Sequence, residues 1–186
     1  MTKFSVRLGI VPKIITVACF IIMSFALIKL TQVLLEGDFN IVYLSLIILL
    51  LISIVSPVFT MPVSIYALDD RLLLKKLLGS KTIFYSDIIV AERFYPKSDI
   101  RIFGSGGYWG FFGIFSNPRI GRYTAFVGDY KEAVLIQVAI AGGYKSYVVS
   151  CRNYDEFIML VNNNRDIRTI LSATTATANN YQNENK

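Results

Sequence analysis

The chain has 186 residues, of which 54% are hydrophobic, and a formal net charge of +6 at neutral pH. It contains no histidine, which removes the commonest general base and the commonest transition-metal ligand of proteins. The positive charge is spread along the chain instead of forming a block, so we expect no binding to nucleic acid.

Two long uncharged runs near the start of the chain are the strongest signal. The first covers residues 14–35 and is interrupted only by Lys29, and the second covers residues 39–68 without a charge. Each exceeds the roughly 20 helical residues that cross a hydrocarbon core of about 30 Å. Lys29 lies near a helix end, where its ammonium can reach the interface. We predict transmembrane helices over residues 14–35 and 39–61.

Two other interpretations of these runs agree less well with the sequence. Buried elements of a soluble core seldom run this far without a charged turn. A cleaved signal peptide requires a small-residue cleavage site, but Ile28-Lys29-Leu30 follows the first stretch and a second apolar run comes soon after it. A retained helical hairpin therefore fits the sequence better.

The flanking charges predict the orientation of this hairpin. Basic residues occur in segment 1–13, before the first helix, and again between residues 71 and 81, after the second, whereas the connecting turn carries only Glu36 and Asp38. The positive-inside rule then places both termini in the cytoplasm. We expect a multi-pass protein of the cell membrane, with a cytoplasmic N-terminus over residues 1–13 and the bilayer as its first partner.

Beyond residue 62 the pattern changes to short apolar runs bounded by turn residues, which is typical of β-strands. The pair Gly142-Gly143 suits a tight hairpin, because glycine readily adopts positive φ. We predict about seven antiparallel strands, with an irregular segment in the middle. The runs cover residues 63–68, 72–78, 82–85, 88–94, 123–127, 133–140 and 145–150.

One amphipathic helix follows the last strand. Asn153 is its predicted N-cap, and Phe157 and Val161 belong to its buried face. Residues 172–186 are rich in Thr, Ala and Asn and have scarcely any bulky apolar side chain. We predict that this tail is disordered.

A segment rich in glycine and aromatic residues carries a family resemblance. Residues 101–113 read RIFGSGGYWGFFG, and residues 117–125 read NPRIGRYTA. These motifs resemble those of a family of bacterial PH-like (pleckstrin-homology-like) domains. The similarity extends over about residues 65–162, and many domains of this family follow two membrane helices. The resemblance implies a membrane α-helical hairpin followed by a mainly-β PH-like barrel over residues 63–165, with about seven antiparallel strands and a C-terminal helix. It implies no catalytic residue.

The role of the glycine-aromatic segment is open at this stage. Its phenylalanines could fold back over a sheet edge and complete the core, which would leave Tyr108, Trp109 and the arginines exposed. The aromatic and basic side chains could instead contact the membrane interface or form a protein-binding hot spot. The candidate contacts to lipid or to a partner are Arg101, Tyr108, Trp109, Arg119, Arg122 and Lys81.

No residue is predicted to be catalytic, to bind a cofactor or to bind a metal. Cys19 and Cys151 are expected to be unpaired, and the adjacent acids Asp69-Asp70 fit a turn. We therefore expect a non-catalytic interaction or scaffolding module at the cytoplasmic face of the membrane, whose partner is another protein or further copies of the chain. The alternative is a sensor of anionic lipid headgroups.

Overall fold

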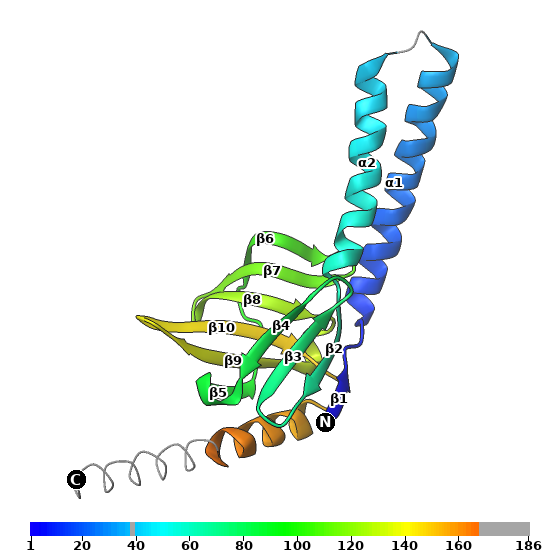
Figure 1. Ribbon diagram of the computed structural model, residues 1–186. Helices are drawn as coiled ribbons and strands as arrows, with labels where there is room; N and C mark the ends of the chain where they lie inside the picture. Colours follow the sequence, from blue (N-terminus) through cyan, green and yellow to red (C-terminus); the bar gives the residue numbers. More distant parts are fainter. Residues whose placement is uncertain (38–39, 168–186) are drawn as a thin grey trace, which may run out of the picture.

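The computed structural model describes residues 1–37 and 40–167, in which two long helices project from a β-rich domain (Figure 1). Helix α1 spans Ile10–Glu36 and helix α2 spans Ile41–Thr60. They lie side by side, and both are long and apolar enough to cross a membrane. The predicted helical hairpin is confirmed, although α1 begins four residues earlier than expected.

Capping and proline residues account for the ends of α2. The side chain of Asn40 accepts a hydrogen bond of 2.9 Å from the backbone N–H of Val42, which satisfies one of the free donors at the helix start. Pro57 lies in the last turn and the helix ends at Thr60, two residues before Pro62. Proline lacks the N–H of one i→i−4 hydrogen bond and its ring crowds the carbonyl of residue i−4, so a helix often ends close to it.

The strands that flank the two helices in the chain belong to one four-stranded antiparallel sheet. Its first strand precedes α1, and the others follow α2. Phe4 of the first strand is buried, with 4% of its surface exposed. Both ends of the helical hairpin therefore join the same sheet. Its order is β1 (Thr2–Ser5), β2 (Pro62–Ala67), β3 (Arg71–Lys76) and β4 (Ser80–Phe84).

The second sheet has six strands. Strands β8 and β10 are parallel and the other neighbours are antiparallel. Gly142 and Gly143 both have positive φ where β9 turns into β10, as predicted. The spatial order is β5 (Ile88–Arg93), β9 (Ala133–Ile140), β10 (Gly143–Ser150), β8 (Gly121–Val127), β7 (Gly110–Asn117) and β6 (Ile100–Gly107).

The described residues thus contain ten strands, so the predicted number of about seven was too low. Besides β1, the prediction missed β6 and β7, which form a hairpin in the segment expected to be irregular. Gly104 and Gly113 oppose each other in this hairpin, with φ of 109° and 116°. A Cβ on Gly104 would overlap the carbonyl oxygen of Phe112, and one on Gly113 would overlap that of Phe103. Glycine is required there, although it weakens the sequence signature of a strand.

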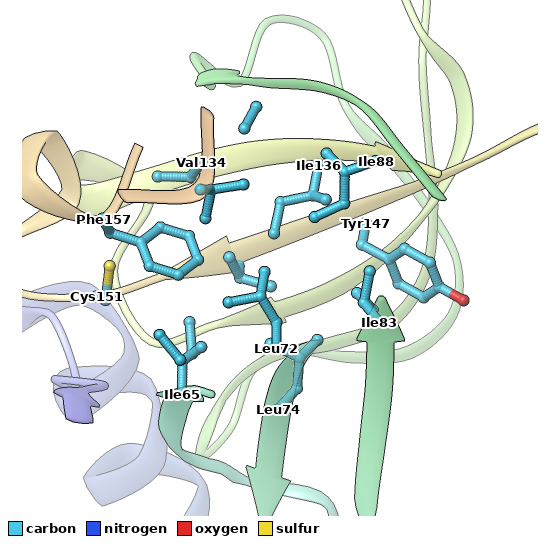
Figure 2. Packing of buried hydrophobic residues seen from close by; sticks show 14 of the residues in the cluster. Ile65, Leu72, Leu74, Ile83, Ile88, Val134, Ile136, Tyr147, Cys151 and Phe157 are labelled. Atoms are coloured by element: carbon cyan, nitrogen blue, oxygen red, sulfur yellow. The ribbon is translucent and has the colours of Figure 1, made fainter. Parts of the chain in front are cut away.

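The main core lies between the two sheets and under the C-terminal helix, residues 154–167 (Figure 2). Leu72 from β3, Ile136 from β9 and Phe157 from the helix are all fully buried. The helix begins after Asn153, whose carbonyl oxygen accepts a 2.9 Å hydrogen bond from the N–H of Phe157. Two packed sheets closed by one helix confirm the expected PH-like fold class, whereas the tail predicted over residues 172–186 lies outside the described residues.

Candidate functional site

The turn between β6 and β7 lies against the base of both helices. The Tyr108 hydroxyl donates a 3.2 Å hydrogen bond to the carbonyl oxygen of Ile54 in α2. The backbone N–H of Trp109 donates a 2.9 Å hydrogen bond to the Thr16 hydroxyl in α1. This turn therefore attaches the β domain to both helices, in addition to the chain connections.

Tyr108 and Trp109 are half-buried in this contact, whereas the interpretation in which the phenylalanines complete the core would leave both exposed. Their rings pack edge to face with centroids 6.4 Å apart. In this turn Trp109 adopts φ of 59°, a conformation that few non-glycine residues take. Amphipathic rings beside the ends of two apolar helices suit the interface between lipid and water.

The phenylalanines of the hairpin divide between the core and the surface. Phe115 is buried, with 5% of its surface exposed, and Phe111 packs against the core on the outer face of the six-stranded sheet. Phe103 is 73% exposed. The interpretation in which these rings complete the core therefore applies to Phe115 and Phe111 but not to Phe103.

A groove separates the β6–β7 hairpin from the bases of α1 and α2. Its volume is about 570 Å³, and its lining includes Ile15, Pro57 and the side chain of Arg101. The Arg101 guanidinium lies along β6, since a Cβ on Gly106 would be only 3.0 Å from its Nη1 atom. Within residues 1–37 and 40–167, no carboxylate forms an ion pair with Arg101.

Arg119 and Arg122 lie near the far end of β7, about 23 Å along this strand from the Tyr108 turn. Arg119 forms a 3.2 Å ion pair with Glu92, in which both side chains are more than 40% exposed. Such surface pairs contribute little to stability. Neither arginine joins the groove at the helix base.

Lys81 lies on β4, an edge strand of the other sheet. Its neighbours on β3 point to opposite faces, as strand alternation predicted: Lys75 lies over the Tyr66 ring at 5.9 Å and Lys76 over the Phe126 ring at 5.1 Å. The six candidate residues therefore fall in three places, and only Arg101, Tyr108 and Trp109 come together.

Comparison with known proteins identifies the β domain. The sequence model of the bacterial PH domain family matches residues 64–164, which is more than half of the chain. The chain belongs to the bacterial PH domain family. The match begins inside β2, so β1 and the two helices of this bacterial PH domain protein lie outside the family region, although β1 pairs with β2. No curated protein and no solved structure matches the chain significantly.

The PH domain also contains a buried polar cluster that sequence reasoning missed. The link from β5 to β6, residues 94–99, connects opposite edges of the sheet and crosses its outer face. Asp99 accepts hydrogen bonds from the Tyr123 hydroxyl, at 2.6 Å, and from the Asn117 side chain. Burial and the bond to Asp99 raise the pKa of Tyr123. Phe94 is fully covered beside it, so the cluster fastens the link to the sheet.

Proposed function

We propose that this protein is a membrane-anchored, non-catalytic interaction module whose PH domain binds a protein partner at the cytoplasmic face. The apolar helices and the distribution of basic residues support the location. The attachment of the domain to the helices supports a fixed position at the bilayer. Strand β1 precedes α1 and β2 follows α2, and the N–H of Gly9 donates a 2.9 Å hydrogen bond to the carbonyl oxygen of Gly128.

The surface that favours a protein partner is β6, an edge strand of the six-stranded sheet. Ile100, Ile102 and Phe103 on this strand are 68%, 49% and 73% exposed. Soluble proteins usually protect an exposed edge with lysine, proline or a covering segment, but the only charged residue of β6 is Arg101. The first five residues of this strand, Ile100–Gly104, are exposed, and such an edge can accept an added strand from a partner. This open edge is the observation that carries the proposal.

Figure 1 places β6 on the side of the sheet nearest the projecting helices. A strand that pairs with β6 would therefore lie close to the membrane surface. The partner is then a second copy or another protein held at the same membrane, in agreement with the expectation of a scaffolding role. Contact with anionic lipid, the alternative, has separate support in the groove beside Arg101.

Site-specific photo-crosslinking in native membranes tests this function. A photoreactive amino acid at Ile102 of β6 should give a protein adduct, and the same residue at Ile89 of β5 is the matched control. The two isoleucines are 49% and 48% exposed, on opposite edge strands of one sheet. An adduct from Ile102 alone supports the proposal, and its mass distinguishes a second copy from another protein. Monomer alone, or equal adducts from both positions, contradicts it.

A further inference from the structure

The groove at the helix base combines apolar walls with a single cation. Both helices and the β6–β7 hairpin contribute to it, and its volume of about 570 Å³ is in the range of small-molecule sites. The apolar lining comes from Ile15 and Cys19 of α1, Pro57 of α2, and Phe103 and Phe112 of the hairpin. The cation is Arg101.

Arg101 is exposed, and no carboxylate among residues 1–37 and 40–167 pairs with it. The three ion pairs among the described residues use Arg71, Arg119 and Arg165 instead. A guanidinium presents parallel N–H donors that match the oxygens of a phosphate. The unpaired positive charge of Arg101 and the apolar lining of the groove therefore suit an anion that also carries apolar chains.

The groove lies at the level where a lipid headgroup would be found. From Cys19 to Glu36, α1 rises about 26 Å, close to the thickness of a hydrocarbon core. Tyr108 and Trp109 lie beside the groove, at the position where interfacial aromatic residues gather. A molecule bound there would extend its chains along α1 and α2 and leave its head at Arg101.

We propose that the groove binds an anionic glycerophospholipid, with the phosphate on the Arg101 guanidinium and the start of an acyl chain against Ile15 and Pro57. This site goes beyond the proposed protein partner, which uses the backbone edge of β6. The lipid would fill the space between the β6–β7 hairpin and the two helices, and it would stabilise the position of the domain relative to the membrane. Its chemistry is charge pairing at one end and apolar contact at the other.

Trp109 provides the test, because it is the only tryptophan in the chain and lies beside the groove. The full-length protein is reconstituted into vesicles of phosphatidylcholine and phosphatidylglycerol in equal amounts, with bromine on the acyl chains of one lipid at a time. We expect brominated phosphatidylglycerol to quench the fluorescence of Trp109 more strongly than brominated phosphatidylcholine does. The difference should correspond to about a fivefold preference for the anionic lipid at the site.

Two arginine variants identify the site. Arg101→Gln should reduce the preference to about one, whereas Arg122→Gln should leave it at about fivefold, because Arg122 lies near the distant turn of β8. Ser56→Phe fills the groove from α2 without changing charge and should weaken quenching by both lipids. Equal quenching by both lipids in the unchanged protein overturns the proposal, as does a preference that survives Arg101→Gln or is lost equally in Arg122→Gln. Protein that fails to float with the vesicles contradicts the membrane anchor itself, and photo-crosslinking at Ile102 is scored independently.

Discussion

Phe4→Ala should destabilise the PH domain far more than Phe84→Ala, although both remove the same ring from the same sheet. Phe4 is 4% exposed and packs edge to face on Phe157 of the C-terminal helix, with ring centroids 5.1 Å apart. Phe84 is 43% exposed. The comparison tests whether the segment before the first helix is part of the domain.

The expected magnitude follows from burial. Removing a buried phenylalanine ring costs about 3–5 kcal/mol, and the edge-to-face pair with Phe157 contributes about 0.5–1.5 kcal/mol of it. We expect Phe4→Ala to lower the free energy of unfolding by about 4 kcal/mol, a large share of the roughly 5–15 kcal/mol of an ordinary domain. Phe84→Ala should cost about 1 kcal/mol or less.

Urea unfolding of the full-length protein in detergent, followed by the fluorescence of Trp109, measures both variants. The midpoint for Phe4→Ala should fall well below that for Phe84→Ala, with little change in the slope of the transition. Equal midpoints would refute the reasoning, since they would mean that β1 is not held in the core. Strand β1 would then not help to attach the helical hairpin to the domain.

Three further outcomes follow from the structure. Gly104→Ala should cost at least about 1 kcal/mol more than Gly142→Ala, because both have positive φ but only Gly104 faces a carbonyl oxygen; equal losses in urea unfolding would contradict this. Burial raises the pKa of Tyr130 to about 12 from 10, so its contribution to stability is complete below pH 10 and is lost as the pH rises toward 12. Tyr130→Phe should flatten the alkaline loss by up to about 1.4 kcal/mol per pH unit, and an unchanged pH profile of unfolding would disprove this. In a Cys19→Ala background, Cys151 should resist maleimide at neutral pH, since it is fully buried and its pKa is raised to about 12; rapid labelling without urea would show that the core is open.

The sequence predicted the elements whose residues carry a local pattern. The two apolar helices, the turn at Gly142-Gly143 and the helix start at Asn153 all depend on neighbours in the chain, and each is found. Strand β1 was missed because four residues, with Phe4 as the one large apolar side chain, carry too little periodicity. Its burial comes from Phe157, more than a hundred residues away.

The hairpin of β6 and β7 was missed for a different reason. Gly104 and Gly113 interrupt the apolar alternation that identifies a strand, and only the opposed carbonyl oxygens show why glycine is required there. Only part of the candidate site was predicted, because the distances between its residues are not visible in the local sequence. Arg101 and Trp109 both lie near the base of the helices, whereas Arg119 lies at the far turn, and this separation depends on strand register.

The central claim is that the helical hairpin crosses the membrane and leaves the PH domain in the cytoplasm. Single cysteines at Glu36, beside the turn between the helices, and at Lys145, on β10 of the domain, test it in a chain that lacks Cys19 and Cys151. In spheroplasts, a maleimide that cannot cross membranes should label Glu36→Cys at once and Lys145→Cys only after permeabilisation. Labelling of Lys145→Cys in sealed spheroplasts, with Glu36→Cys protected, would contradict the account.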